Sequence, residues 1–340
     1  MADGKRSDRA AALQGPGDVE IVRRQARAPS PAEAVVRVVA SGVCATDVGI
    51  FRGRVPVPAG RVLGHEGAGF VEVAPDGSAL ERGTPVLIDP NVYCGTCAVC
   101  REGLLNLCPS GGLLGRDADG VFVDEFPVAP ASLHALPDAV RLEDAPLLQV
   151  LATVVHAQEQ VRVVPGRLAA VVGLGCTGQL HAQLLATRGA RVLGISRSES
   201  KRALAARLAC ELTAAPDEAL GLAAGLDARG GADLVVEAAG TLASLETAIR
   251  LVRPGGTVLA YGIQTEKEGG LPYYELYRKE IRVVGARSSL PRDMEIAVGL
   301  AAGGAVQLEP IVSDRLPLEA VAEAFDRAAA GALKVVLKHS

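Results

Sequence analysis

The stretch Leu168–Gly178, which reads LAAVVGLGCTG, decides the fold of the second half of the chain. Its first five residues are apolar and predict a buried β-strand, which passes directly into the glycine pattern G-x-G-x-x-G and a helical pattern. Glycines here allow a tight turn and let backbone N–H groups approach a pyrophosphate at the helix N-terminus. The alternative is a glycine-rich turn with a purely structural role. We predict a dinucleotide-binding turn at Gly173, Gly175, Cys176, Thr177 and Gly178.

Strands and helices alternate along the chain after this turn. Helical stretches continue to Arg188 and lie at Glu199–Leu208 and Ala243–Val252. The strand-like runs between and after them are Arg191–Ile195, Ala232–Val236, Thr257–Tyr261 and Ile281–Val284. This alternation is typical of βαβ units in a doubly wound parallel sheet with helices on both faces. The sequence therefore predicts an α/β Rossmann domain over residues 153–287.

The chain before this region has a different texture, with short strands punctuated by Gly, Pro and Asp. The strands predicted there are Ala34–Val39, Gly69–Val73 and Thr84–Ile88. The last segment of the chain holds two helical stretches and a terminal strand, Leu333–Leu337. We assign residues 1–152 and 288–340 to one β-rich domain, and we expect residues 1–9 to be a disordered tail.

Composition narrows the class of protein. The 340 residues suffice for about two domains of roughly 150 residues each. A net charge of −4 and the absence of Trp argue against a nucleic-acid surface. No apolar run approaches the roughly 20 residues of a membrane span, and the charged start MADGKRSDR does not resemble a signal peptide. We expect a cytoplasmic protein that acts on a small molecule, without a nucleic-acid or membrane partner.

Four of the seven cysteines form a cluster with the spacing C-x2-C-x2-C-x7-C. Zinc prefers four tetrahedral ligands, and thiolates can supply all of them. Metal binding would also supply folding energy to a lobe that has little apolar core of its own. The alternatives are four unrelated thiols or an iron–sulfur cluster. We predict a closed structural zinc site in the lobe 90–110, held by Cys94, Cys97, Cys100 and Cys108.

A second candidate metal site comes from residues far apart in sequence. Cys44 lies in SGVCATD, and His65 and Glu66 lie in GHEGAG. Each motif sits at the edge of a predicted strand, beside glycines that allow close backbone approach. A Cys/His pair with a third ligand and one open position is typical of catalytic zinc. From spacing alone, a buried structural cysteine and histidine remain the alternative.

Together these motifs resemble the zinc-dependent medium-chain alcohol dehydrogenases from end to end. The resemblance covers SGVCATD, GHEGAG, the cysteine lobe, the nucleotide turn, RPGGTVLAYG at 253–262 and the closing ALKVVL. It implies a GroES-like β-rich catalytic domain together with a Rossmann domain. It also implies catalytic zinc on Cys44 and His65, with Glu66 as an alternate ligand or a group beside the metal.

Two positions depart from the family pattern. The family's third zinc ligand is a Cys, Asp or Glu, whereas this chain has Gln149, as the family's glucose dehydrogenase branch does. The Gln149 amide oxygen can bind zinc but brings no charge, and we expect Glu66 to supply the missing negative charge. The alternative is that Gln149 marks a lost catalytic zinc. Gly49 stands where many relatives have a histidine that passes protons to solvent.

The strand after the nucleotide turn bears on the cofactor. NAD enzymes place an Asp or Glu about 20 residues after the turn, where it binds the ribose hydroxyls. The strand RVLGI ends instead in Ser196-Arg197-Ser198, with Lys201 one turn later. Ser196 can donate to a 2′-phosphate and Arg197 can meet it as a charged fork. We favour NADP, and the alternative is a solvated loop in which Ser198 caps the next helix and either cofactor works.

The resemblance also implies roles for single residues. Thr46 matches the residue that hydrogen-bonds the alcohol and passes its proton to the cofactor ribose, and Asp47 is expected to orient the metal ligands. Thr153, four residues after Gln149, resembles the residue packed against the nicotinamide ring. Gly262, the last residue of RPGGTVLAYG, completes the expected cofactor site.

The predicted function is an NAD(P)-dependent oxidoreductase. Zinc lowers the pKa of a bound alcohol, whose carbon can then release hydride to nicotinamide. The polar groups around the zinc and the scarcity of aromatic residues favour a sugar, polyol or cyclitol as substrate. The alternatives are a zinc-free reductase of an activated double bond or quinone and a dinucleotide-binding sensor, but quinone-reductase relatives lack the cysteine lobe and GHE. A dimer or tetramer is expected, with Thr257–Tyr261 at the sheet edge.

Overall fold

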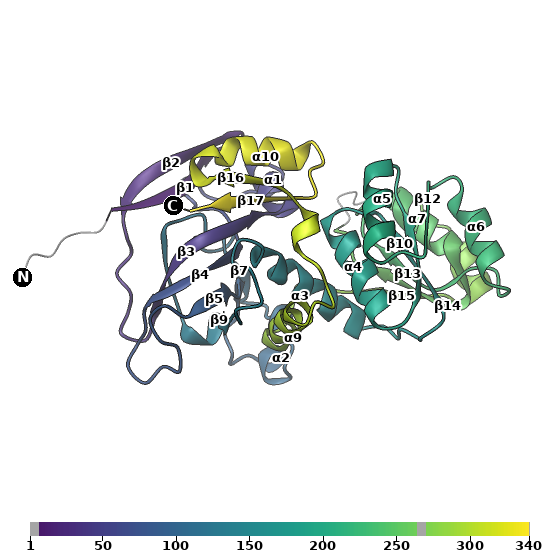
Figure 1. Ribbon diagram of the computed structural model, residues 1–340, viewed down its shortest axis with the longest axis horizontal. Helices are drawn as coiled ribbons and strands as arrows, with labels where there is room; N and C mark the ends of the chain where they lie inside the picture. Colours follow the sequence, from purple (N-terminus) through teal and green to yellow (C-terminus); the bar gives the residue numbers. More distant parts are fainter. Residues whose placement is uncertain (1–6, 264–269, 340) are drawn as a thin grey trace, which may run out of the picture. The chain divides into compact units, whose positions relative to one another are not determined.

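The computed structural model describes residues 7–263 and 270–339, which form two compact units (Figure 1). Unit 1 contains the residues up to 152, residues 290–302 and the residues from 311 onward. Unit 2 contains residues 153–289 and 303–310. The sequence predicts 303–310 in the first domain, and the structure corrects this prediction. The segment belongs to unit 2 because the Gln307 N–H donates to Gln183 Oε1 at 2.8 Å and Thr187 Oγ1 donates to the Ala305 carbonyl at 3.2 Å.

Unit 1 is built on a seven-stranded sheet. The pair β16–β17 is parallel, and all the other strand pairs of this sheet are antiparallel. Strand β8 (Glu125–Val128) pairs with β3 outside the main order. The main order of strands is β16 (Val312–Pro317), β17 (Lys334–Lys338), β3 (Ala34–Val43), β4 (Glu66–Val73), β5 (Pro85–Ile88) and β9 (Leu133–Ala135). Valines of β3 and β4 face one core, and residues of β17 and α10 (Val321–Ala329) build a second core. The predicted strands of this unit are therefore confirmed, and β3 and β4 are longer than expected.

The predicted tail is wrong for residues 7–9. Strand β1 (Ser7–Gly15) forms an antiparallel hairpin with β2 (Asp18–Gln25). The Arg9 side chain pairs with Asp124, and the Ala11 N–H donates to the Phe122 carbonyl at 2.8 Å. The alanine-rich sequence gives no strand signal of its own, so the hairpin is hidden although β2 is its neighbour in sequence, and residues more than 100 positions away add further contacts. Residues 1–6 of the predicted tail lie outside the described part of the chain.

Unit 2 is a six-stranded, fully parallel sheet. Its strand order is β12 (Leu212–Ala214), β11 (Arg191–Ile195), β10 (Leu168–Val172), β13 (Ala232–Glu237), β14 (Val252–Ala260) and β15 (Arg282–Gly285). Alternate residues of β10 face opposite cores, one lined by helices α4 (Cys176–Thr187) and α5 (Glu199–Leu208), the other by α6 (Ala219–Leu226) and α7 (Leu242–Leu251). Figure 1 shows these two helix pairs on the two faces of the sheet. The α/β Rossmann prediction is confirmed.

The predicted sheet edge is wrong. Thr257–Tyr261 overlaps β14, which pairs with β13 on one side and β15 on the other. An apolar strand in a parallel sheet is buried on both faces, so its apolar character indicates the sheet interior rather than the edge. The edge strand on this side is β15, whose residues are largely exposed.

The remaining elements belong to both units. Helix α3 (Pro146–Glu159) carries the segment that joins the two units in sequence. None of the helices within residues 7–263 and 270–339 is long and apolar enough to cross a membrane. The other short elements are α1 (Ala45–Phe51), β6 (Asn91–Val92), α2 (Ala98–Arg101), β7 (Gly112–Leu113), α8 (Tyr273–Lys279) and α9 (Pro291–Ala302), with 3-10 turns at Leu105–Leu107, Pro130–Ser132, Glu309–Ile311 and Leu318–Ala320.

Candidate metal and dinucleotide sites

The four clustered cysteines lie together in unit 1. Their sulfur atoms are all within 4.8 Å of one another. Cys94 Sγ lies 3.9 Å from Cys100 Sγ and 3.6 Å from Cys108 Sγ. A tetrahedral zinc with Zn–S bonds of about 2.3 Å places its sulfurs about 3.8 Å apart. The spacing of the thiols therefore fits a closed four-thiolate zinc site.

Backbone N–H groups of the same lobe point at these sulfurs. The Cys97 N–H donates to Cys94 Sγ at 3.4 Å, and the Cys100 N–H donates to Cys97 Sγ at the same distance. The Cys94 N–H donates to Cys108 Sγ at 3.5 Å. The backbone N–H groups of Thr96 and Cys97 lower the pKa of the Cys94 thiol to about 6. These donors favour the thiolate form of Cys94, whereas burial raises the pKa of the Cys100 thiol to about 12.

The second predicted site is also assembled in unit 1. Cys44 caps the N-terminus of α1 directly after β3, and Glu66 begins β4, which pairs with β3. One ligand atom from each of Cys44, His65 and Glu66 lies within 4.8 Å of the others. The antiparallel register, in which Gly42 lies opposite Glu66, brings together two motifs separated in sequence. A thiolate, an imidazole and a carboxylate are a donor set that fits zinc.

Asp47 contacts both Cys44 and His65. Asp47 Oδ2 accepts the Cys44 N–H at 2.9 Å, and Asp47 Oδ1 lies 3.3 Å from His65 Nδ1. This contact leaves His65 Nε2 as the nitrogen available to a metal, the arrangement of a carboxylate–histidine–zinc unit. Burial lowers the pKa of His65, but the negative charges of Asp47 and Cys44 outweigh burial and raise this pKa well above its ordinary value. The site therefore has the electrostatic character that attracts a cation.

Glu66 is paired with a buried lysine of the last strand. Lys334 Nζ donates to both carboxylate oxygens of Glu66, at 2.8 and 2.7 Å, and to the Val43 carbonyl at 3.1 Å. Gly42 makes room for this carboxylate, because a Cβ there would lie 2.0 Å from Glu66 Oε2. We expected Glu66 to supply the negative charge that Gln149 lacks. This expectation needs correction, since the Lys334 ammonium offsets that charge.

Two other predicted catalytic residues lie on helices. Thr46 is half-buried in the first turn of α1, two residues after Cys44. Gln149 is buried in α3, and Thr153 lies four residues later on the same helix. The direct role of Gln149 as a zinc ligand stays a prediction.

The predicted nucleotide turn has the geometry that glycine requires. Gly173 has a φ of +98°, and a Cβ there would lie 2.8 Å from the Ala239 Cβ. A Cβ on Gly178 would lie 1.8 Å from the Gly173 carbonyl oxygen. Gly175 is the N-cap of α4, so Cys176 and Thr177 form the first turn of that helix. The first glycine thus allows the tight turn and the third allows close packing, as in a dinucleotide-binding turn.

The tip of β11 presents positive charge. Ser196 Oγ accepts the Ser198 N–H at 3.2 Å, and Ser198 Oγ caps α5 by accepting the Lys201 N–H. Arg202 donates to the Ser196 carbonyl at 2.6 Å and to the Arg197 carbonyl at 3.2 Å, which fixes this loop. Within residues 7–263 and 270–339, no carboxylate forms an ion pair with the exposed Arg197 side chain. The loop therefore offers a hydroxyl and a guanidinium at the expected place.

Two structural relationships connect Gly262 and Thr153 to the carboxyl end of β14. A Cβ on Gly262 would lie 2.4 Å from the Gly240 nitrogen, so glycine is required there. Tyr261, which follows β14, places its hydroxyl 2.7 Å from Thr153 Oγ1. The expected cofactor residues of unit 2 therefore gather where ligands bind to open parallel sheets.

Comparison with known protein families decides the assignment. The family described as the alcohol dehydrogenase GroES-like domain matches residues 30–138, and the family described as zinc-binding dehydrogenase matches residues 176–303. A 2-dehydro-3-deoxy-L-galactonate 5-dehydrogenase of Pseudoalteromonas atlantica is 30% identical over 93% of this chain and 94% of its own length. The chain belongs to the zinc-dependent medium-chain dehydrogenase family. It is therefore an oxidoreductase that uses zinc and a nicotinamide cofactor.

Two further relatives of this dehydrogenase are informative. A D-altritol 5-dehydrogenase of Agrobacterium fabrum is 34% identical over 87% of this chain and 89% of its own length. Among solved structures, a zinc-binding dehydrogenase of Sinorhizobium meliloti bound to NADP superposes with a TM-score of 0.91. It is 28% identical, and the match covers 98% of this chain and 99% of that one.

Sequence reasoning missed three residues at the sites of this dehydrogenase. Lys334 is the charged residue inside the apolar motif ALKVVL, a signal that could have indicated a buried partner. Tyr261 lies inside RPGGTVLAYG, but the sequence offers no sign that its hydroxyl reaches Thr153. Arg202 shares a helix with Lys201, and only the structure shows that it supports the β11 loop.

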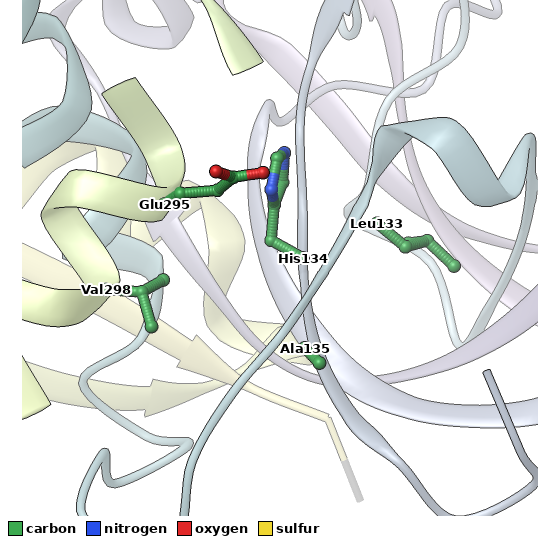
Figure 2. Close-up of a pocket in the computed structure, with 5 residues that line it drawn as sticks. All are labelled: Leu133, His134, Ala135, Glu295 and Val298. Atoms are coloured by element: carbon green, nitrogen blue, oxygen red, sulfur yellow. The ribbon is translucent and has the colours of Figure 1, made fainter. Parts of the chain in front are cut away.

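The dehydrogenase also has a separate cavity of about 270 Å³ in unit 1 (Figure 2). The Glu295 carboxylate points toward the His134 ring across it. Burial lowers the pKa of His134, against the opposing effects of Asp89 and Glu295. None of the predicted site residues lines this cavity, whose walls are Leu133, His134, Ala135, Glu295 and Val298.

Proposed function

We propose that this protein is a zinc-dependent NAD(P) oxidoreductase that interconverts a polar secondary alcohol and its carbonyl. The observation that carries the proposal is the convergence of Cys44, His65 and Glu66 within 4.8 Å, with Asp47 holding His65. We infer two zinc ions per chain, one structural and one catalytic. Bound zinc would supply Lewis-acid polarisation of the substrate oxygen, and a bound nicotinamide cofactor would supply the hydride acceptor.

The chain's own residues orient the substrate and move its proton. Cys44 and His65 would hold the metal, and the Gln149 amide oxygen would complete the protein ligands without adding charge. The Thr46 hydroxyl would accept the proton of the substrate hydroxyl and donate its own hydrogen onward to the cofactor ribose. Asp47, through its contact with His65 Nδ1, would leave His65 Nε2 available to bind the metal.

The proposed substrate class is a sugar, sugar acid or polyol. The Pseudoalteromonas and Agrobacterium relatives are named as 5-dehydrogenases of 2-dehydro-3-deoxy-L-galactonate and of D-altritol, both rich in hydroxyl groups. Thr46 and Gln149 contribute hydrogen-bonding groups that a simple alkanol leaves unpaired. Unpaired buried polar groups reject apolar analogues strongly, by as much as about 10⁴-fold.

A substrate comparison tests this proposal. We expect kcat/KM for D-altritol, sorbitol or L-galactonate to exceed that for 2-propanol, cyclohexanol and benzyl alcohol. Steady-state rates with NADP and with NAD for each alcohol measure the difference. Faster oxidation of the plain alcohols than of every polyol and sugar acid would contradict the substrate class.

NADP is the proposed preferred cofactor. The exposed Arg197 guanidinium and the Ser196 hydroxyl lie at the tip of β11, without a carboxylate at the ribose position. Arg202 supports this loop by binding its carbonyls. The similarity to a dehydrogenase solved with NADP supports the same preference.

Replacing Arg197 with alanine should weaken NADP binding about ten- to a hundredfold, because a charge-assisted hydrogen bond contributes about 1.5–3 kcal/mol. NAD binding should stay nearly unchanged, since NAD has no 2′-phosphate. The matched control is Arg207→Ala, which removes an exposed arginine of α5, the helix that follows the Arg197 loop. Equal NADP affinity in R197A and the parent enzyme, measured by fluorescence titration, would overturn the assignment of the 2′-phosphate site.

We also propose that the enzyme assembles as a dimer or tetramer through β15. This strand pairs with β14 alone among the described strands, and Val283 is 48% exposed. An unpaired edge with an exposed apolar residue is a template for a second strand. Light scattering at micromolar concentration should give a dimeric or tetrameric mass, and Val283→Lys should lower it. A monomeric mass for the unmodified protein would refute the proposal.

A further inference from the structure

Tyr261 connects three parts of unit 2 at the carboxyl edge of its sheet. Its backbone N–H donates to the Glu237 carbonyl at 3.0 Å, which fixes its position beside the end of β13. Its hydroxyl lies 2.7 Å from Thr153 Oγ1 on α3. Its ring packs against the core below α4 and meets the His181 ring nearly perpendicularly, at 81° and 4.5 Å between centroids.

The partner ring is itself fixed. His181 is fully buried in α4, the helix that begins at the nucleotide turn. Gln158 Nε2 donates to His181 Nδ1 at 3.1 Å and to the His181 carbonyl at 3.1 Å. Burial lowers the pKa of His181 to about 3, so the imidazole stays neutral at physiological pH. The Tyr261 ring therefore packs against an imidazole that is fixed in place and uncharged.

The Tyr261–Thr153 hydrogen bond restricts Thr153. Threonine is branched at Cβ, so holding Oγ1 against one partner also fixes the direction of the methyl group. Thr153 is half-buried and lies at the edge of the sheet where nicotinamide cofactors bind. The hydrogen bond therefore selects one rotamer of Thr153, so a group that packs against this residue meets a single, defined surface.

We propose that Tyr261 is a positioning residue for the nicotinamide half of the cofactor: its hydroxyl fixes the side chain of Thr153, against which the nicotinamide ring packs. The inference rests on the proposed function, because it requires a bound nicotinamide cofactor. It assigns to Tyr261 an indirect role, carried by Thr153. The pyrophosphate and adenosine parts of the cofactor, which bind at the α4 turn and at the tip of β11, should not depend on the Tyr261 hydroxyl.

The test compares a whole cofactor with a fragment that lacks nicotinamide. In Tyr261→Phe, the dissociation constant of NADPH should rise about two- to fivefold, because the released Thr153 side chain must then be ordered when the ring binds. The dissociation constant of 2′-phospho-ADP-ribose should stay unchanged, and kcat should fall with the loss of ring alignment. NADH and ADP-ribose are measured in parallel. The chain has no Trp, which simplifies titration by dinucleotide fluorescence.

Thr153→Val and the double variant show whether the two hydroxyls act together. If they act through one hydrogen bond, the double variant should bind NADPH no more weakly than either single variant, because contacting residues are not additive. The control is Tyr277→Phe, which alters a tyrosine that is 81% exposed.

Each remaining outcome has a defined meaning. Equal weakening of NADPH and of the fragment would show general distortion of the site and overturn the inference. Unchanged NADPH binding and kcat in Tyr261→Phe would also overturn it. If the unmodified enzyme binds neither reduced dinucleotide, the proposed function itself fails.

Discussion

Replacing Cys44 with serine should lower kcat/KM about a thousandfold or more. The Cys44 thiolate supplies the negative charge of the proposed catalytic zinc site, since Lys334 already offsets Glu66. Serine is a poor zinc ligand at neutral pH, and losing the metal removes several kcal/mol of transition-state stabilisation, which is a factor of about 10³. Cys44 lies at the N-terminus of α1 and is only partly buried, so the fold should remain intact.

The matched variant is Cys97→Ser in the four-cysteine lobe. Because metal binding supplies the folding energy of such a lobe, this variant should lose thermal stability. Elemental analysis should find two zinc ions in the parent enzyme and one in Cys44→Ser. Full activity in a preparation that holds a single zinc would disprove the catalytic role of the Cys44 site.

Where each signal is local, the sequence predicts the structure closely. The predicted strands Leu168–Val172 and Arg191–Ile195 and the helix Glu199–Leu208 coincide with β10, β11 and α5. In the Rossmann unit, each strand or turn is encoded by the apolar run or the glycines of the same short segment. The four cysteines are equally local, which is why their spacing alone indicates a metal lobe.

Most of the misplaced features depend on partners distant in sequence. Strand β1 pairs with the adjacent strand β2, but its alanines carry no strand signal of their own, and its further contacts reach a segment more than 100 residues away. The position of β14 inside the sheet follows from its pairing with β15, which no local pattern encodes. Segment 303–310 lies in unit 2 through hydrogen bonds to α4.

The Glu66–Lys334 pair is the clearest case of a site feature that the sequence hides. The two residues are 268 positions apart, on strands that flank β3. Lys334 is 4% exposed and Glu66 is fully buried, so each needs the other to offset its charge. The motifs GHEGAG and ALKVVL are both visible in the sequence, but the strand order that makes them neighbours is not.

Replacing Lys334 with methionine should lower the free energy of unfolding by about 3–5 kcal/mol, because it leaves the Glu66 carboxylate buried without a counter-charge. Denaturant titration of the zinc-loaded enzyme measures the loss. The double variant Glu66→Gln/Lys334→Met removes both charges and should recover much of the stability, which gives a large coupling energy in a double-mutant cycle. Additive single and double variants would show that the pair contributes nothing beyond its separate side chains.

The same variants test whether the Glu66–Lys334 pair also sets the charge at the Cys44–His65 site. The Lys334→Met variant leaves the negative charge of Glu66 unbalanced beside this site. It should therefore bind zinc more tightly than the double variant, which lacks that charge.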